Sequence, residues 1–336
     1  MHTLISVVIP VYNQEKYIRE CLDSLFPQCT DEVEVILVND GSKDQSGAIC
    51  KEYISRYPVN AKLIDQENSG SLRSRMNGIQ HSAGEYILFM DSDDLLLEHA
   101  LDTLIQTLHQ KRYDMLLFNA TCDLATRKPH FQIPLKHGQE LTGDDRYQVY
   151  RLLSGTPVLN NLWTKCIRKE LFQTAALPPN GQRLTNGEDL FQILDMADHA
   201  KSFLYLDRVL YYYRVMTDSI SRVYNPHYFS SEKIVCAKRV EYAKKWGKGD
   251  ELIPGARAET YKIMREIARK VLISNMSWKE IKKEMSGLRS DAFFREYYLK
   301  ANDAPDHRDY VLKAPFPVMY ITRLFYKLKT KIKRAK

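Results

Sequence analysis

The chain has 336 residues, of which 44% are hydrophobic and 27% are charged, a composition typical of soluble globular proteins. It contains no run of 18 uncharged apolar residues that would span a bilayer, and its first ten residues lack the basic stretch that opens a secretory signal. The net charge of +7 is unevenly distributed: residues 241–336 carry 23 Lys and Arg against 12 Asp and Glu, whereas residues 1–240 are net acidic.

The first 120 residues alternate between short apolar runs and amphipathic patterns. Strands are predicted at residues 4–10, 32–40, 60–66, 85–91 and 113–120, with helical patterns near residues 14–26, 44–57, 70–82 and 96–111. This alternation predicts an α/β fold with a doubly wound, mostly parallel sheet and helices on both faces. Ligands of such sheets bind beyond the carboxyl ends of the strands.

Polar residues follow four of these strands. They are Tyr12 and Asn13, the segment Asn39–Ser42, Glu67 and Asn68, and the cluster Asp91–Asp94. Asp40, in "VNDGSKDQS", could accept hydrogen bonds from a nucleobase edge, or it could simply belong to a turn that caps the next helix. Pro10 and Tyr12 could line a base pocket or merely turn the chain.

The acidic cluster in "FMDSDD" points to a divalent cation. Residues i and i+2 of an extended segment face the same way, so the carboxylates of Asp91 and Asp93 converge. Mg²⁺ is commonly held by one or two carboxylates together with substrate phosphates. The structural alternative is an acidic helix N-cap, and we assign that role to Asp94, at the start of "LLLEHALDTLIQTL".

The pattern loosens after residue 121. The clearest helix lies at residues 186–200, and an aromatic strand pair is predicted at residues 203–214. Beyond residue 226 the pattern is mostly helical, with a capping box at Ser277 and Glu280. We expect a catalytic domain at residues 1–225, a helical C-terminal region at 226–312, and a basic amphipathic helix at 313–336.

The C-terminal segment "PVMYITRLFYKLKTKIKRAK" combines apolar residues at helical spacing with many basic ones. Eight Lys and Arg and no acid occur from Lys313 onward. Such a helix is suited to lie in an anionic membrane surface, so we expect a peripheral protein on the cytoplasmic face of the plasma membrane. An RNA-binding tail and a solvated basic helix without a partner are the alternatives.

The cysteines and histidines show no metal-binding pattern. The six cysteines form no CxxC pair, so we expect reduced thiols in a cytosolic compartment and no structural zinc. The histidines lack HxH or HExxH spacing, although a late histidine as a further metal ligand stays open.

Four segments together resemble the family 2 glycosyltransferases of the GT-A fold. They are "SVVIPVYNQEKYIRECLDSL", "VILVNDGSKDQS", "ENSGSLRSRMNGIQHSAGEYILFMDSDD" and "GEDLF", and the likeness recurs in "NLWTKCIRKELF" and fades after about residue 225. Bacterial members of this kind build capsular polysaccharide, exopolysaccharide or lipopolysaccharide chains. The resemblance implies a GT-A-type fold, a UDP-linked sugar donor, Mn²⁺ or Mg²⁺, and a glycan acceptor. It does not identify the donor sugar or the linkage. The membrane-binding tail fits an acceptor that is lipid-linked.

The resemblance also implies roles for individual residues. Asp189 of "GED" matches the catalytic base, Asp93 with Asp91 matches the metal site, and Asp91 also faces the ribose and donor sugar. The matching donor-binding positions are Pro10, Tyr12, Asp40, Glu67, Arg75, Asp91 and Arg214. Arg75 lies near the diphosphate in this interpretation, and Arg214 with "SIS" at 219–221 belongs to a loop over the donor.

One segment departs from the family pattern. The common "SxARNxG" reads "LRSRMNG" here, which keeps Arg75 but puts Met76 in place of an asparagine that contacts the donor sugar. The mechanism implied is an inverting displacement in which Asp189 takes the proton of the acceptor hydroxyl, a step typically worth ~10² to 10⁴ in rate.

Single residues of the site also have structural interpretations, and the whole chain has two alternative functions. Asp189 by itself could be an acid favoured by the helix dipole, and Arg214 could be a solvated arginine at the end of a core strand. A sugar nucleotidyltransferase would need a glycine-rich phosphate loop, which "VVIPVYNQEK" lacks. A membrane-bound scaffold of the same fold without turnover is the non-enzymatic alternative.

Overall fold

The computed structural model describes residues 2–57, 59–215, 224–300, 312–321 and 323–324. The chain divides into two compact units. The first contains residues 1–153, 158–184 and 188–215, and the second contains residues 154–157, 185–187 and 216–336. The functional domains expected from the sequence, with boundaries at 225 and 312, stay a prediction.

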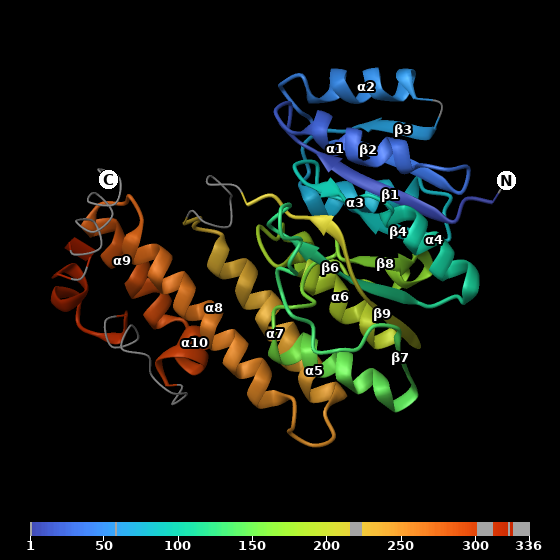
Figure 1. Ribbon diagram of the computed structural model, residues 1–336. Helices are drawn as coiled ribbons and strands as arrows, with labels where there is room; N and C mark the ends of the chain where they lie inside the picture. The colour runs from blue at the N-terminus through green and yellow to red at the C-terminus, as the bar shows by residue number, and fades with distance from the viewer. Residues whose placement is uncertain (1, 58, 216–223, 301–311, 322, 325–336) are drawn as a thin grey trace. The chain divides into compact units, whose positions relative to one another are not determined.

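One mixed sheet forms the centre of the first unit (Figure 1), with strand order β3-β2-β1-β4-β8-β6-β9-β5 and β7 paired to β9. The strands are β1 (Ile5–Val11), β2 (Val33–Asn39), β3 (Asn60–Asp65), β4 (Tyr86–Phe89), β5 (Leu95–Leu96), β6 (Met115–Thr121), β7 (Gln139–Thr142), β8 (Lys165–Arg168) and β9 (Ser202–Tyr212). Because β1 to β4 pair in parallel, their carboxyl ends meet at one edge of the sheet.

Helices cover both faces of this sheet, as the alternation of patterns predicted. The helices in the described part of the chain include α1 (Ile18–Leu25), α2 (Ser46–Arg56), α3 (Ser71–Gln80), α4 (Ala100–Gln110), α5 (Tyr147–Gly155), α6 (Glu188–His199), α7 (Tyr228–Trp246), α8 (Ile253–Ile273), α9 (Trp278–Ser290) and α10 (Ala292–Phe294), the last followed by a π-helical turn (Arg295–Leu299). Buried residues of α1, α2 and α4 share a core with Val7 and Ile9 of β1. α3 packs on the other face, where a side chain at Gly78 would collide with Val8 and Val38.

Two strands differ from the sequence prediction. β8 lies between β4 and β6 and is antiparallel to both, so a strand from outside the first 120 residues enters the sheet. The aromatic segment predicted as a strand pair is the single strand β9. The chain passes the exposed residues Asp207 and Arg208 without a turn, and its register against β6 shifts there.

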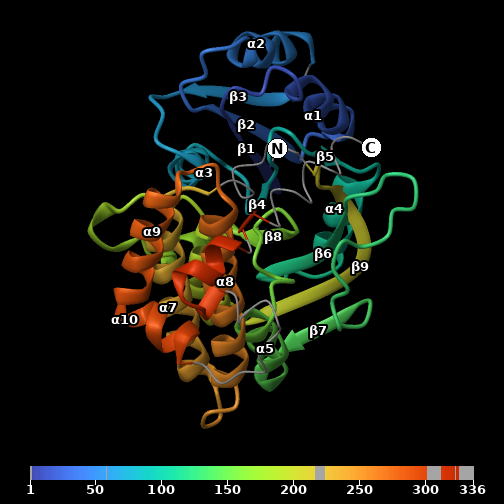
Figure 2. The same ribbon diagram turned by 90° about the vertical axis from the view of Figure 1, so that its left-hand side faces the viewer.

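The second unit contains three long helices, α7, α8 and α9 (Figure 2). Tyr261, Met264, Ile267 and Val271 form the predicted apolar stripe of α8 and are buried. The predicted capping box is confirmed at the start of α9, where Ser277 Oγ accepts a hydrogen bond from the Glu280 backbone N–H. The Glu280 carboxylate in turn accepts one from the Ser277 backbone N–H, at 2.7 Å.

Residues 316–321 are helical and pack on α9, where the Trp278 ring centroid lies 5.0 Å from that of Tyr320. Arg289 donates hydrogen bonds to the carbonyl oxygens of Leu312 and Ala314, at 3.0 and 2.6 Å. Residues 325–336 of the predicted membrane-surface helix lie outside the described residues. No helix in the described part of the chain has the length and apolarity needed to cross a membrane.

Candidate active site

The loops that follow β1 and β2 are joined by hydrogen bonds at the carboxyl edge of the sheet. The Asn13 backbone N–H donates to Ser42 Oγ at 3.1 Å, and the Lys43 backbone N–H donates to Asn13 Oδ1 at 2.8 Å. Pro10 is half-buried, and Tyr12 is 44% exposed. The predicted convergence of polar strand ends is thus present for β1 and β2.

Asp40 ties the second of these loops to the third. Its side chain is buried, and its Oδ1 accepts hydrogen bonds from the Ser69 backbone N–H and from Gln66 Nε2, both at 2.7 Å. Its Oδ2 accepts from the backbone N–H of Gly70 at 2.9 Å. Glu67 is exposed beside this network. Asp40 therefore fixes the turn that leads into α3, and the base-reading role assigned to it stays a prediction.

The three aspartates after β4 occupy different environments. Asp94 is buried, and its carboxylate accepts hydrogen bonds from Tyr211 Oη and from the Arg214 backbone N–H, both at 2.8 Å. Burial, followed by the negative charges of Asp91 and Asp93, raises the pKa of Asp94 to about 9. A protonated or strongly hydrogen-bonded carboxyl group is favoured at this position.

The sequence-based assignment of Asp94 as a helix cap was wrong. The helix α4 begins at Ala100, and its N-cap residue, His99, makes no capping hydrogen bond with its side chain. Gln28 Oε1 instead accepts from the Ala100 backbone N–H at 3.0 Å. The short strand β5 separates Asp94 from the helix and pairs with the end of β9. Asp94 is therefore turned toward β9, where Tyr211 provides its donor.

Asp91 and Asp93 form the part of the cluster that fits a divalent cation. Asp91 is 29% exposed, and Asp93 is half-buried with its pKa raised to about 6 by burial and by the charge of Asp91. Mutual repulsion of this kind is relieved by a bound cation. No group of three or more His, Cys, Asp or Glu side chains suited to a metal ion exists among the described residues. Mg²⁺ is commonly bound by one or two carboxylates together with substrate phosphates, so a pair of carboxylates is sufficient.

Arg214 fixes the backbone of this cluster. Its Nε donates a hydrogen bond to the Asp93 carbonyl at 2.8 Å, and its Nη2 donates to Glu20 Oε2 at 2.6 Å. Its guanidinium also lies 5.1 Å from the ring centroid of Tyr17. Arg214 thus lies next to the acidic cluster, whereas the "SIS" segment at 219–221 lies outside the described residues.

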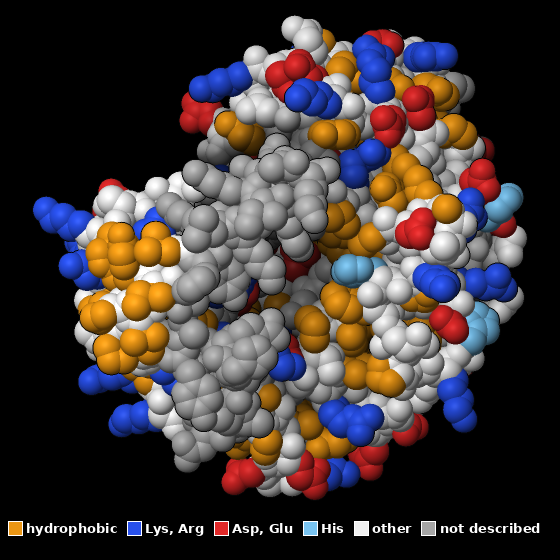
Figure 3. All heavy atoms as spheres, turned by 60° about the vertical axis from the view of Figure 1, so that its left-hand side comes forward, with side chains coloured by type: hydrophobic (Ala, Val, Ile, Leu, Met, Phe, Trp, Pro, Cys, Tyr) orange, Lys and Arg blue, Asp and Glu red, His pale blue; other side chains and the backbone are white. Residues whose placement is uncertain are grey.

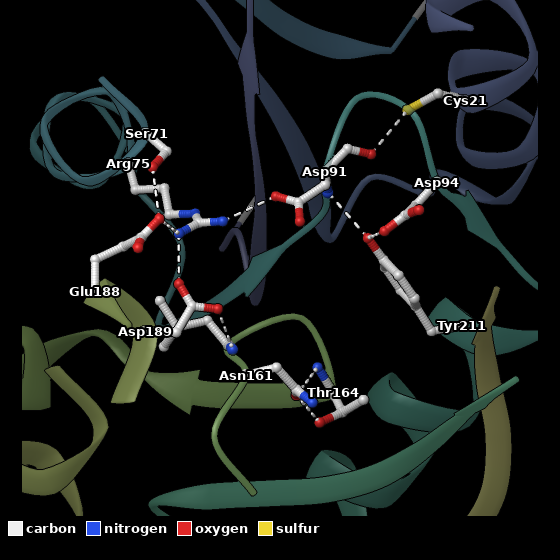
Figure 4. A network of polar contacts seen from close by, with 11 residues as sticks. Cys21, Ser71, Arg75, Asp91, Asp94, Asn161, Thr164, Glu188, Asp189 and Tyr211 are labelled. Atoms are coloured by element: carbon white, nitrogen blue, oxygen red, sulfur yellow. Dashed lines mark hydrogen bonds and ion pairs between the residues drawn. The ribbon is translucent and has the colours of Figure 1, made fainter. Parts of the chain in front are cut away.

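Arg75 of α3 connects this acidic cluster to α6 (Figure 4). Its Nη2 lies 2.9 Å from Asp91 Oδ1, and its Nη1 lies 2.6 Å from Asp189 Oδ1. A third carboxylate, that of Glu188, lies 4.0 Å from Nη1 and also accepts a hydrogen bond from Ser71 Oγ. The arginine side chain is only 5% exposed, so these carboxylates are the main counter-charges of a buried cation.

Asp189 has the environment of a carboxylate that titrates near neutral pH. It lies in the first turn of α6, and its Oδ2 accepts a hydrogen bond from the Leu162 backbone N–H at 3.0 Å. Burial raises the pKa of Asp189 to about 6, and the positive charge of Arg75 limits the rise. Asp189 is thus ionised at neutral pH and remains basic enough to accept a proton.

The structure brings together Asp91, Arg75 and Asp189, which the sequence assigned to one site, and their roles stay predictions. Sequence reasoning missed residues that support them. Tyr211 was assigned no role, although its hydroxyl donates to Asp94 and accepts from the Asp91 backbone N–H at 3.0 Å. Leu162 lies in "NLWTKC", a segment noted only for its resemblance. A polar atom buried in an aromatic strand was the available signal for Tyr211.

Comparison with known proteins also indicates a glycosyltransferase. A family model described as glycosyl transferase family 2 matches residues 6–142. Glycosyltransferase GlyG of Streptococcus pneumoniae is 32% identical to this chain over 231 residues, which cover 66% of this chain and 74% of GlyG. The chain spans 32% of the length of another curated relative that it matches and 65% of two more.

Solved structures support the GT-A-type fold. Residues 1–349 of S. aureus TarS, in complex with UDP-GlcNAc, match with a TM-score of 0.61 and 20% identity, over 97% of this chain and 92% of that chain. The mannosyltransferase PcManGT of Pyrobaculum calidifontis, in complex with GDP-Man and Mn²⁺, matches with a TM-score of 0.53 and 14% identity, over 97% of this chain and 88% of that one.

Proposed function

This chain belongs to glycosyl transferase family 2, and from that premise we propose that it is an inverting glycosyltransferase of bacterial surface polysaccharide synthesis. It transfers a sugar from a UDP-linked donor to a lipid-linked glycan acceptor. The observation that carries this proposal is the chain of contacts Asp91–Arg75–Asp189 at the carboxyl edge of the parallel strands.

The donor binds, in this proposal, at the edge formed by Asp40, Asp91 and Asp93. The TarS and PcManGT complexes, which hold a nucleotide sugar in the same fold, support the choice of donor class. Asp91 and Asp93 would hold Mn²⁺ or Mg²⁺ together with the diphosphate of the donor. When bound, the cation supplies positive charge against which the nucleoside diphosphate leaves.

The protein's own residues carry the proton transfer. Asp189 Oδ1 or Oδ2 takes the proton of the acceptor hydroxyl as that oxygen attacks the anomeric carbon from the side opposite the leaving group, which inverts the centre. Arg75 orients the carboxylate, because its two terminal nitrogens contact Asp189 and Asp91 at the same time. The Leu162 backbone N–H holds the other oxygen of Asp189.

The second unit supports a peripheral membrane location. Val318, Ile321 and Leu324 are spaced by three residues and are 46%, 54% and 45% exposed. Lys279, Lys282 and Lys283 of the neighbouring helix α9 are exposed as well. Figure 3 shows hydrophobic side chains bordered by Lys and Arg side chains at the left of that view. An exposed apolar helix face with basic neighbours is suited to an anionic lipid surface.

The proposed activity is tested by calorimetry and by product analysis. The full chain is titrated with UDP with and without Mn²⁺, and a panel of nucleotide sugars is screened for hydrolysis and for transfer to lipid-linked glycans. We expect metal-dependent nucleotide binding and release of the nucleoside diphosphate from one donor. Nucleotide binding without turnover for any donor would favour the scaffold function, and the absence of any binding would contradict both.

A further inference from the structure

Lys165 is a buried lysine that the proposed mechanism does not use. Its side chain is about 1% exposed, and its Nζ donates a hydrogen bond to the backbone carbonyl of Asn161. It is the first residue of β8, and its register partner in β6 is Leu117. An ammonium group removed from water needs compensating charge or hydrogen bonds. The burial of the Lys165 ammonium therefore points to a role in the fold or in the site.

The topology places Lys165 close to the reacting end of the sheet. Because β8 runs antiparallel to β4, with Cys166 opposite Leu88, the start of β8 lies beside the carboxyl end of β4. Asp91 follows β4 at that end. The insertion of β8 into the sheet therefore carries a buried positive charge to the same edge as the acidic cluster.

The same lysine closes the turn that holds the proposed base. The Lys165 backbone N–H donates to the Leu162 carbonyl at 3.1 Å, and the Thr164 backbone N–H donates to Asn161 Oδ1 at 3.3 Å. Figure 4 shows the contacts between Thr164 and Asn161. With the bond from Lys165 Nζ to the Asn161 carbonyl, these contacts fix residues 161–165. The Leu162 backbone N–H at the centre of this turn is the donor to Asp189 Oδ2.

We infer that Lys165 is a positioning residue for Asp189: it orders the turn that presents the Leu162 N–H to the base, and its buried charge stabilises the ionised carboxylate. This inference rests on the proposed function, in which Asp189 is the base. Two groups whose charges interact shift each other's titration by equal amounts, because the coupling free energy belongs to the pair.

The charges around Asp189 set the direction of the effect. Arg75 of α3 and Lys165 of β8 are positive, whereas Glu188 of α6 and Asp91 after β4 are negative. Burial lowers the pKa of Lys165 to about 7, and the charge of Asp189 opposes this lowering. Below pH 7 Lys165 is therefore largely protonated, in the range where Asp189 itself titrates.

The test compares three variants of the full chain. Lys165→Gln keeps a hydrogen-bond donor and removes the charge, Lys165→Arg keeps the charge, and Thr164→Val weakens the same turn without touching the charge. We expect Lys165→Gln to move the acid limb of kcat/KM upward by at least about half a pH unit. Lys165→Arg should leave the limb in place. Thr164→Val removes the hydroxyl that donates to Asn161 Oδ1, so it loosens the turn but keeps the charge, and it should move the limb less than Lys165→Gln does. An unmoved limb in Lys165→Gln overturns the inference.

A reciprocal measurement needs neither turnover nor a change at Lys165. The pKa of the Lys165 ammonium is followed by NMR of lysine-labelled protein, in the natural chain and in Asp189→Asn. Removal of the negative charge should lower this pKa by about half a unit or more, and the same pKa in both proteins overturns the inference. If no donor is turned over, the proposed function fails, while this measurement still decides whether Lys165 and Asp189 are coupled.

Discussion

Arg75 Nη1 lies 2.6 Å from Asp189 Oδ1, although the two residues are 114 positions apart in the chain. The contact joins a helix at the carboxyl edge of the sheet to the helix that bears the proposed base. It forms because α3 and α6 each direct a charged side chain toward the carboxyl end of β4, where Asp91 supplies the third member. The proposed donor site and the proposed base are thus parts of one buried ion network.

Replacement of the base is the first prediction that follows from this network. Asp189→Asn keeps the size of the side chain, but its single amide oxygen can accept from only one of the two donors, Leu162 N–H and Arg75, and it cannot take a proton. We expect kcat to fall by ~10² to 10⁴ with an unchanged dissociation constant for UDP. Steady-state kinetics and calorimetry check this, and near-normal turnover would eliminate Asp189 as the base.

The pH dependence of the reaction follows from the raised pKa of Asp189. A base acts in its ionised form, and burial raises the pKa of this carboxyl to about 6. The value of kcat/KM should therefore be constant above that pH and fall about tenfold for each unit below it. Rates measured between pH 5 and pH 8 in several buffers test this. A limb near pH 4, the ordinary range of aspartate, would show that burial does not perturb the group in solution.

A divalent cation should stabilise the protein through Asp93. Burial and the charge of Asp91 raise the pKa of Asp93 to about 6, so its carboxylate is ionised and repelled at pH 8 but largely protonated at pH 5. We expect Mn²⁺ at 100 times its dissociation constant to add about 2.7 kcal/mol at pH 8, and clearly less at pH 5.

The control for this prediction is the Asp93→Asn variant. Without the cation it should be at least as stable as the natural chain, because one repelling charge is removed. With Mn²⁺ its melting temperature should rise much less. An equal rise in both proteins would place the cation elsewhere.

The sequence predicted the parts of this site that depend on local pattern and on motif order. Alternating strands and helices placed Asp40 and Asp91 at one edge of a parallel sheet, and the GT-A resemblance added Arg75 and Asp189. The roles of adjacent aspartates were harder to predict. Asp94 looked like a helix cap, but its partners Tyr211 and Arg214 lie about 120 residues later, and only the folded sheet brings them together.

The insertion of β8 is a second feature that pattern could not supply. A strand of four residues, Lys165–Arg168, has too short a pattern to be assigned to a place between β4 and β6. Yet that place determines which residues lie next to Asp91 and why a lysine is buried there. The position of β8 next to Asp91 depends on long-range strand pairing, and this pairing depends on the packing of the whole unit.

Tyr211 should matter for both stability and catalysis. Tyr211→Phe removes a hydroxyl that donates to Asp94 and accepts from the Asp91 backbone N–H. Leaving the buried Asp94 carboxyl without this partner costs about 1–3 kcal/mol of unfolding free energy, measured in urea. We also expect a lower kcat/KM, because the Asp91 backbone loses its support.

Tyr113→Phe is the matched control, since it removes a hydroxyl that donates to Glu140 at 2.6 Å. Tyr113 lies beside Tyr86, the first residue of β4, at the end of that strand opposite to the acidic cluster. It should cost stability without changing kcat/KM. Equal kinetic effects in the two variants would mean that the Tyr211 hydroxyl has no special connection to the site.

The exposed apolar face of residues 316–324 should bind anionic membranes. We expect the full chain to sediment with vesicles that contain phosphatidylglycerol and not with vesicles of phosphatidylcholine alone, because basic residues accompany the apolar face. Introducing two acids with Val318→Asp and Ile321→Asp should weaken this binding at least about tenfold, since both side chains are exposed and available for burial in lipid.

Leu177→Asp is the control, because it places an acid at a leucine that is 58% exposed in the first unit and should leave vesicle binding unchanged. Equal sedimentation of the natural chain and the double variant would show that this face is not the anchor. Binding of the natural chain to RNA, with steep dependence on salt and without affinity for vesicles, would instead assign the basic C-terminal segment to nucleic acid.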